Sequence, residues 1–340
     1  KNKILLIYNS FDNPGLVKVL TFLQTHNTEY LSGQDLSDVL RISRVAVWKH
    51  IKKIQELGYT VKSKQKLGYK LTANSEVLLP WEITSGLKTE KIGQQAYYFD
   101  SLDSTQNQAL KMSRDISKNG AIIIAAKQTG GKGRSGRKWI SPKGGIFLSI
   151  ILHPKFDISI TTLFPIASAL ALSIALEKTF KISPELKWPN DLTIKGKKIA
   201  GMLVDVSLES NKIENLVLGV GINFDVDVKQ IEKELKDAPN FYGVSSLSEH
   251  KKKVKPIQLV QSFLIELEVI YKLLETKQTE KIISEWTKRS STIGKNVKLS
   301  TIDGEIKGKA IRIDHDGALV ISKNKTSNRI IAGDIIHLQK

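Results

Sequence analysis

The densest group of potentially reactive residues lies at positions 128–139, where the sequence reads QTGGKGRSGRKW. Four glycines and four cationic side chains share this segment, which ends on a tryptophan. Glycine lets backbone N–H groups approach an anion closely, and lysine and arginine pair with phosphate oxygens. The segment therefore predicts a phosphate-binding loop that uses Lys132, Arg134, Arg137 and Lys138. A solvated basic loop without a ligand is the alternative.

Neither standard phosphate-binding motif explains this loop. Gly131, Gly133 and Gly136 satisfy the dinucleotide-binding spacing G-x-G-x-x-G, and the preceding AIIIAAKQT predicts a strand. That motif needs a helix to follow, but a proline and two glycines at 142–145 interrupt helical propagation. The Walker pattern G-x-x-x-x-G-K-[ST] does not occur here either. The segment is therefore expected to connect two strands.

Three further motifs combine polar side chains with turn-forming residues. DSTQ at 103–106 joins a predicted strand to a predicted helix and offers hydroxyl and amide groups at the helix N-terminus. KWPNDL at 187–192 predicts a turn flanked by a lysine and a large aromatic residue. In KGKKIAGMLVD, Lys198 enters a strand whose small residues Ala200 and Gly201 let a flat ligand lie close. Simple helix capping and a plain surface turn are the alternatives for the first two motifs.

Composition excludes several kinds of chemistry. The chain has no cysteine, which rules out disulfides, thiolate metal sites and a thioester-forming nucleophile and favours a cytoplasmic location. Its six histidines show no metal-ligand spacing. The N-terminus does not resemble a signal peptide, and the longest apolar run, 164–176, predicts a buried helix too short to cross a bilayer. No membrane partner is expected.

Length and charge indicate several domains and a polyanionic partner. At 340 residues, the usual domain size predicts two or three domains. Residues 1–75 carry 12 Lys and Arg against 5 Asp and Glu, a net charge of +7, whereas the much longer remainder carries +11 of the total +18. The higher charge density at the front predicts a nucleic-acid partner for this part, with a general lysine bias as the alternative.

Residues 16–72 show helical spacing followed by the alternation typical of strands. Ser32 followed by Asp35 resembles a capping box, Ser43 is a second N-cap candidate, and Gly58 ends the longer helix. The pattern predicts a helix, a second helix, a tight turn, a third helix and a hairpin, which is the order of a winged helix-turn-helix.

The third helix has an apolar face and a basic face. Val47, Ile51 and Ile54 fall on one side, so that the opposite side carries Arg44, Trp48, Lys49, Lys52 and Lys53. Such a helix suits the major groove of DNA, and the hairpin adds backbone contacts through Lys62, Lys64 and Lys66. The expected DNA contacts are Ser43, Arg44, Lys49 and Lys52. A solvated basic helix is the alternative.

The rest of the chain changes pattern twice. From about Val77, where VLLPW predicts a linker or docking strand, strands alternate with helices at 104–114, 164–180 and 256–275, which indicates a mixed α/β domain. From about Ile293, short strands separated by turns predict a small barrel of about 48 residues.

The motifs DST, GKGRSGRKW, KWPNDL, KKIAGMLVD and GVGIN, in this order, resemble those of the biotin-protein ligase family. The resemblance covers residues 16–340, and the helix-turn-helix makes the chain similar to the bifunctional members that also repress biotin genes. It implies an α+β protein of three domains. These are a winged helix-turn-helix domain at 1–76, a mixed α/β biotin/lipoate-ligase catalytic domain at 77–290 and an SH3-like β-barrel at 291–340.

The family's reaction implies biotin, ATP and Mg²⁺. The biotin carboxylate attacks the α-phosphorus of ATP, and the resulting biotinyl-5'-AMP acylates a lysine of a biotin carboxyl carrier protein. Neither step needs a covalent enzyme intermediate, which agrees with a chain without cysteine. The expected partners are this carrier protein, operator DNA and a second copy of the chain.

The matching motifs imply specific contacts. The expected biotin contacts are Ser104, Thr105, Gln106, Gln128, Lys132, Gly133, Arg134 and Lys198. Arg137 and Trp139 are expected to hold or cover the adenylate, and Asn223 to lie near the adenosine. The expected catalytic residues are Lys198, which bridges the biotin carboxylate and the α-phosphate, Arg134 and Lys187. Asn190 or Asp191 is expected to organise Mg²⁺, and the protein ligands of the metal stay open.

Two departures from the family and two alternative functions bear on this interpretation. Lys132 stands where the family loop usually has arginine, so the bidentate fork is lost, and DSTQ replaces the usual DSTN.

A ligand-sensing repressor without ligase activity is one alternative, but Lys198, Arg134 and KWPND are intact. A lipoate-protein ligase is the other, although such enzymes normally lack the N-terminal DNA-binding module.

Overall fold

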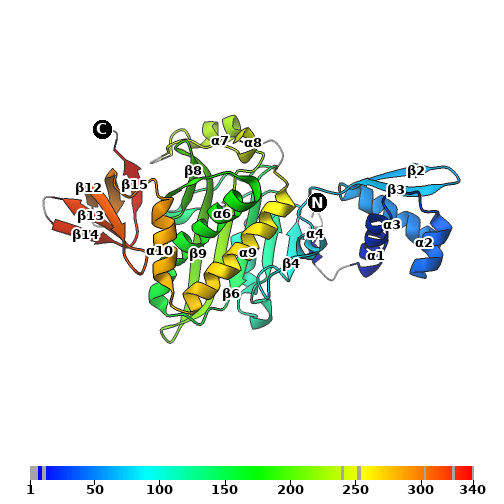
Figure 1. Ribbon diagram of the computed structural model, residues 1–340, viewed down its shortest axis with the longest axis horizontal. Helices are drawn as coiled ribbons and strands as arrows, with labels where there is room; N and C mark the ends of the chain where they lie inside the picture. The colour runs from blue at the N-terminus through cyan, green and yellow to red at the C-terminus, as the bar shows by residue number, and fades with distance from the viewer. Residues whose placement is uncertain are drawn as a thin grey trace.

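The computed structural model describes residues 7–9, 13–238, 241–250, 254–301, 304–323 and 326–338. These residues form three parts that follow one another along an elongated molecule (Figure 1). A small helical domain lies at one end, a large sheet covered by helices forms the centre, and a small all-β domain lies at the other end (Figure 1).

The N-terminal part has the predicted helices and hairpin, which are α1 (Pro14–Thr25), α2 (Gly33–Leu40), α3 (Arg44–Glu56), β2 (Thr60–Lys64) and β3 (Gly68–Ala73). Both predicted caps are present. Ser32 Oγ accepts from the Asp35 N–H at 3.0 Å, and Ser43 Oγ accepts from the Ala46 N–H at 3.1 Å. These bonds satisfy N–H groups that lack a partner within the helix, so α2 and α3 begin where the sequence indicated.

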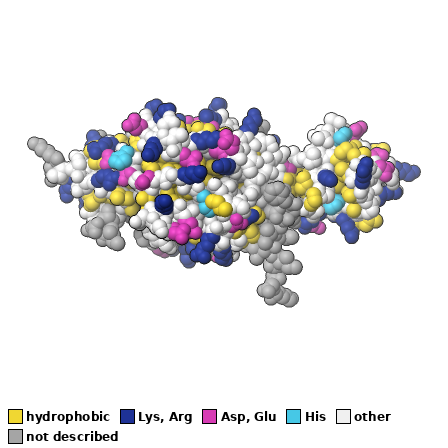
Figure 2. Space-filling view, turned by 90° about the horizontal axis from the view of Figure 1, so that it is seen from below, with side chains coloured by type: hydrophobic (Ala, Val, Ile, Leu, Met, Phe, Trp, Pro, Cys, Tyr) yellow, Lys and Arg dark blue, Asp and Glu magenta, His cyan; other side chains and the backbone are white. Residues whose placement is uncertain are grey.

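Helix α3 presents its basic face to solvent. Val47, Ile51 and Ile54 are buried, whereas the expected DNA contacts Ser43, Arg44, Lys49 and Lys52 are exposed. Lys53 differs from the prediction, because it is half-buried and its Nζ lies 3.1 Å from Glu56 Oε2. Figure 2 shows that Lys and Arg side chains are also spread along the central domain, so the positive charge is not confined to the helix-turn-helix.

The central domain is built on an eight-stranded sheet with the order β1-β4-β5-β6-β10-β9-β8-β7. Among the described strands of this sheet, β4 and β5 pair in parallel and the other neighbours are antiparallel. The strands are β1 (Ile7–Asn9), β4 (Ala96–Phe99), β5 (Ile122–Ala125), β6 (Ile146–Leu152), β7 (Glu185–Lys187), β8 (Asp191–Ile194), β9 (Lys197–Glu209) and β10 (Lys212–Ile222). KWPNDL is therefore the turn of the β7–β8 hairpin, as predicted.

Helices cover both faces of the sheet. Helices α6 (Phe164–Phe180) and α9 (Pro256–Glu275) lie on one face, and α6 is apolar all round because it is buried between the sheet and α9 (Figure 1). Helix α5 (Thr105–Met112) covers the other face, where Ala109 packs against Ile123 and Ile151. None of the described helices combines the length and apolar character that a membrane crossing requires.

Several short helices were not predicted. Residues 77–79 of the VLLPW segment form a linker and not a strand, and Pro80 and Trp81 begin α4 (Pro80–Thr84), because proline suits the first helical turn. The others are α7 (Val228–Leu235), α8 (Leu247–His250), α10 (Thr279–Lys288) and the 3-10 helices η1 (Ile116–Lys118), η2 (Arg134–Gly136) and η3 (Ile158–Thr162).

The C-terminal part is an antiparallel sheet with the order β14-β13-β12-β11-β15. Its strands are β11 (Asn296–Thr301), β12 (Gly304–Ile313), β13 (Leu319–Lys323), β14 (Thr326–Ile330) and β15 (Asp334–His337). The predicted SH3-like barrel is not confirmed, because the edge strands β14 and β15 do not pair among the described residues. Trp188 Nε1 donates to Gly317 O at 3.0 Å, which fixes this sheet to the β7–β8 hairpin.

Candidate active site

A cavity of about 400 Å³ brings the predicted central-domain site residues together. It lies between the loop that connects β5 and β6, the strands β9 and β10, and the segment around α7. Its lining includes Ser104, Thr105, Gln106, Gln128, Lys132, Gly133, Arg134, Arg137, Trp139, Lys187, Asn190, Asp191, Lys198 and Asn223. Motifs separated by more than a hundred residues therefore face one space.

Trp139 forms one wall of this cavity. A Cβ on Gly221 would lie 2.4 Å from Trp139 Cε2, and one on Gly201 would lie 3.0 Å from Trp139 Cζ3, so both strand positions need glycine. The sequence predicted that Gly201 leaves room for a flat ligand, and in the structure the indole occupies that place. Trp139 Nε1 is buried and has no hydrogen-bond partner in the described part of the chain. The indole N–H is therefore an unsatisfied donor in the cavity wall.

One end of the cavity is a buried polar network. Gln128 Oε1 accepts from the Thr105 N–H at 2.7 Å and from Thr105 Oγ1 at 3.1 Å. Ser149 Oγ lies within hydrogen-bond distance of Thr105 Oγ1 and Gln106 Oε1, at 2.9 Å from each. The Gln106 amide donates to Asp205 Oδ2 at 2.9 Å and to a β10 carbonyl at 3.0 Å. Its donors are thus already engaged, so Gln106 fixes helix α5 to the sheet.

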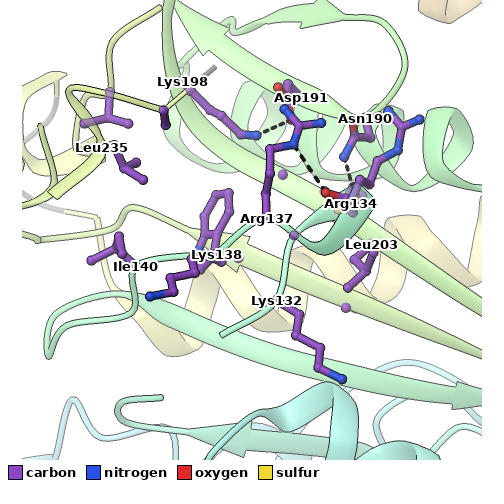
Figure 3. Close-up of a pocket in the computed structure, with 18 of the residues that line it drawn as sticks. Lys132, Arg134, Arg137, Lys138, Ile140, Asn190, Asp191, Lys198, Leu203 and Leu235 are labelled. Carbon is purple, nitrogen blue, oxygen red and sulfur yellow. Dashed lines mark hydrogen bonds and ion pairs between the residues drawn. The ribbon is translucent and has the colours of Figure 1, made fainter. Parts of the chain in front are cut away.

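The basic loop runs from β5 to β6, as predicted, and folds back on itself. Gly133 N–H donates to Arg137 O at 2.7 Å, and Trp139 N–H donates to Gly131 O at 2.9 Å. Arg134 Nη1 donates to Asn190 Oδ1 at 3.2 Å, which joins the loop to the β7–β8 turn. Figure 3 shows that Arg134 and Arg137 point toward the Asn190–Asp191 turn, whereas Lys132 points away from it.

Opposite charges meet at the other end of the cavity. Lys198 Nζ lies 2.6 Å from Asp191 Oδ1 and 5.1 Å from the centroid of the Trp139 ring. Figure 3 shows Lys198 and Asp191 directed at each other across the cavity. Lys187 lies beside them, and burial lowers the pKa of its ammonium group to about 8. We call Lys187, Asp191 and Lys198 the charged cluster.

Two other predicted residues have defined positions. Asn223 Nδ2 donates to Lys198 O at 3.2 Å, so Asn223 links the end of β10 to the start of β9. Asn190 Nδ2 donates to Met202 O at 2.6 Å, which fixes its amide at the cavity wall. No group of three or more metal-ligating side chains occurs in the described ranges.

Sequence reasoning missed several lining residues. Ser149 is the single polar residue in IFLSIIL, and a polar group in a buried strand was the available signal. No sequence signal marked the residues that face the cavity from the region of α7 and from the C-terminal sheet, including Ile231, Leu235, Phe241, Tyr242 and Ile335.

Sequence profiles match all three parts of the chain. Residues 16–70 match an HTH domain, residues 98–223 match the biotin/lipoate A/B protein ligase family, and residues 292–338 match a biotin protein ligase C-terminal domain. The fold and the cavity, together with these matches, define a ligase of the biotin/lipoate class that carries an N-terminal helix-turn-helix.

Similar proteins narrow this class. The chain is 35% identical to the bifunctional ligase/repressor BirA of Bacillus subtilis (strain 168) over 316 residues, which cover 92% of this chain and 95% of the relative. It is 28% identical to the protein of the same name from Escherichia coli (strain K12), over 95% of this chain and 97% of the relative. The chain therefore belongs to the family of bifunctional ligase/repressor BirA proteins.

A solved structure supports the assignment. The biotin protein ligase of Aquifex aeolicus in complex with biotin and ATP superposes with a TM-score of 0.62 at 26% identity. The match covers 74% of this chain and 100% of that one.

Proposed function

We propose that the chain is an ATP-dependent ligase that activates biotin as biotinyl-5'-AMP and transfers it to a lysine of a biotin carboxyl carrier protein. We further propose that it acts as a biotin-responsive repressor of biotin genes. The observation that carries the proposal is the single cavity in which a basic loop, the charged cluster and a buried polar network meet, on a chain that also has an exposed basic recognition helix.

The two ends of the cavity suit the two ends of the biotin adenylate. The polar network offers hydroxyl and amide groups for a small polar ring system, with Ser104, Thr105, Gln106 and Gln128 on this side. Gly133, Arg134 and Lys198 hold the carboxylate end, and Lys132 contacts biotin from the loop on the side away from the Asn190–Asp191 turn. Arg137, Trp139 and Asn223 hold the adenylate, and the free Trp139 N–H supports this placement.

The first step joins two anions, so cations must lie between them. A carboxylate oxygen of biotin attacks the α-phosphorus, the bond to the bridging oxygen breaks, and pyrophosphate leaves. Lys198 exchanges its partner Asp191 for the biotin carboxylate and the α-phosphate, while Arg134 and Lys187 neutralise phosphate charge. The acceptor lysine then attacks the carbonyl carbon, and AMP leaves.

The residues present fit a Mg²⁺ ion that arrives with ATP. Such an ion is commonly bound by one or two carboxylates together with substrate phosphates and water. Asp191 supplies a carboxylate and Asn190 an amide oxygen at the cavity wall. When bound, the ion would neutralise phosphate charge, and Asp191 is the residue we assign to hold it.

The N-terminal domain supplies the DNA-binding surface. Arg44, Lys49 and Lys52 lie exposed on α3, and Ser43, whose hydroxyl caps the helix, stands at its N-terminus. Recognition helices of this kind act in pairs, so we propose a homodimer that places two α3 helices on two operator half-sites.

Three finer assignments accompany the function. We place the domain boundaries at 1–76, 77–290 and 291–340, and each profile match falls within one of these ranges. We infer that the C-terminal sheet curls as an SH3-like barrel, which a register shift in β12 between Ala310 and Arg312 supports. The cytoplasm, where a biotin carrier and operator DNA coexist, is the proposed location.

Mass spectrometry of an acceptor domain tests the ligase function. After incubation of the protein with ATP, Mg²⁺, biotin and a biotin carrier domain, we expect the carrier to gain the mass of one biotinyl group. Omission of ATP should abolish the change. Modification by lipoate in place of biotin would reverse the substrate assignment, and no modification with either acid would leave a ligand-sensing repressor.

Lys187 predicts a pH dependence for the adenylation step. Burial is the main reason why its pKa falls to about 8, Lys198 lowers it further, and Asp191 opposes the shift. Since only the charged ammonium neutralises phosphate, kcat/KM for MgATP should fall as pH rises through about 8. Lys187→Arg should move this fall to higher pH, because a guanidinium stays charged. If kcat/KM of Lys187→Arg falls at the same high pH as that of the wild type, Lys187 is not the group whose loss of charge slows adenylation.

A further inference from the structure

Tyr242 is held over the charged cluster by the backbone that follows it. The Lys198 N–H donates to Gly243 O at 3.0 Å, and the Ser245 N–H donates to Lys198 O at 3.0 Å. Val244 between them forms a parallel bridge with Lys198. The segment after α7 is therefore fixed along the start of β9, and this contact sets the position of Tyr242.

Two parts of the Tyr242 side chain contact two members of the charged cluster. The hydroxyl donates to Asp191 Oδ2 at 2.6 Å, and Lys187 Nζ lies 3.2 Å from the ring centroid. These contacts are a charge-assisted hydrogen bond and a close cation–π pair. In this hydrogen bond the hydroxyl is the donor and the carboxylate oxygen is the acceptor.

The two contacts restrict the charged cluster in complementary ways. Because Tyr242 engages Oδ2 of Asp191, the carboxylate is held in one orientation, in which Oδ1 faces the cation, here Lys198 Nζ at 2.6 Å. The ring face favours the charged form of Lys187 and fixes its Nζ at one point in a buried site.

Tyr242 lines two cavities, which makes its substitution feasible. A second cavity of about 390 Å³ borders the same ring and shares Lys187, Phe241 and Ile335 with the first. Removal of the ring would enlarge space that already exists beside it, so the fold is expected to tolerate it better than the loss of a core side chain.

We propose that Tyr242 is a positioning residue for ATP, whose hydroxyl orients Asp191 and whose ring centres Lys187, so that both side chains meet the triphosphate in one arrangement. This inference rests on the proposed adenylation activity and concerns the nucleotide alone. The ring system of biotin binds at the opposite end of the cavity and only its carboxylate reaches Lys198, so biotin affinity should change far less than nucleotide affinity when Tyr242 is replaced.

Two substitutions separate the hydroxyl from the ring. Tyr242→Phe should raise KM for MgATP about tenfold through loss of a hydrogen bond to a charged group. Tyr242→Leu should raise it about fivefold further, because the cation–π pair is also lost. Biotin-dependent pyrophosphate exchange gives KM and kcat, and kcat should fall less than KM rises. Tyr97→Phe is the matched control, because its ring also faces a lysine, with Lys118 Nζ at 5.6 Å, but lies outside the cavity.

Calorimetry provides a readout that does not depend on turnover. One titration measures the affinity for biotin, and a second measures the affinity for α,β-methylene-ATP with Mg²⁺ in the presence of biotin. In both variants we expect weaker binding of the nucleotide analogue and little change in biotin binding. Equal nucleotide affinity in wild type and Tyr242→Phe would overturn the inference, and so would parallel losses of biotin and nucleotide affinity. If the wild-type chain binds the analogue but shows no biotin-dependent pyrophosphate exchange, the proposed function alone is contradicted. The ratio of nucleotide affinities in wild type and Tyr242→Phe would still decide the role of Tyr242.

Discussion

Replacement of Lys198 with alanine is expected to slow biotin adenylation by at least about a hundredfold, which corresponds to about 3 kcal/mol of transition-state stabilisation. Its Nζ lies 2.6 Å from Asp191 Oδ1 inside the cavity, where a fixed cation acts on the developing charge with little screening by water. Biotin-dependent pyrophosphate exchange measures this step directly, because it does not require the acceptor protein.

The neighbouring lysine provides the control for this substitution. Lys197 is exposed and its Nζ lies 3.9 Å from Glu232, so Lys197→Ala removes the same charge one position away and should leave the exchange rate within about twofold of wild type. The melting temperatures of Lys198→Ala and Lys197→Ala should agree, because Asp191 still accepts the hydrogen bond from the Tyr242 hydroxyl when Lys198 is lost. Exchange at the wild-type rate in Lys198→Ala would reject the catalytic role.

Local chemistry in the sequence was sufficient to predict much of the site. Helix caps such as Ser43, and the turn at KWPNDL, depend on residues a few positions apart and appear in the structure where the sequence indicated. The motifs face one cavity because they lie at strand ends or in the loops beside them, and the sheet order brings those ends together. Their order along the chain was enough to indicate the family.

Contacts that depend on distant pairing were not predictable. The Trp139 indole occupies the place expected for a flat ligand because the β9–β10 register sets Gly201 opposite Gly221. Gln106 lines the cavity, and its amide donates to Asp205 and to β10, contacts that no local pattern shows. Tyr242 belongs to no motif, and the bridge between Val244 and Lys198, which are far apart in the sequence, brings it over the charged cluster. Barrel closure likewise depends on whether β14 and β15 meet.

Biotin together with ATP is expected to tighten operator binding at least about tenfold, because a ligand that favours the dimer must also favour the DNA complex. Biotinyl-5'-AMP accumulates only when little unmodified acceptor protein is present to consume it. Its accumulation therefore signals that the carrier protein is already biotinylated. Excess carrier domain should therefore weaken operator binding again. Fluorescence anisotropy with a biotin-gene promoter, with and without both ligands, measures the change, and analytical ultracentrifugation measures dimerisation in the same samples.

The same assay locates the DNA contacts on α3. The double variant Lys49→Ala, Lys52→Ala should lose operator affinity and reduce the slope of log affinity against log salt by about two, because two phosphate contacts are removed. Lys88→Ala, Lys281→Ala removes two exposed charges from the central domain and should leave both quantities unchanged. A chain that begins near Val77 should bind no operator. If ligands leave operator affinity unchanged, the ligase and the DNA-binding domain are not coupled, and if no biotin-gene promoter binds at all, the basic face of α3 is a solvated surface.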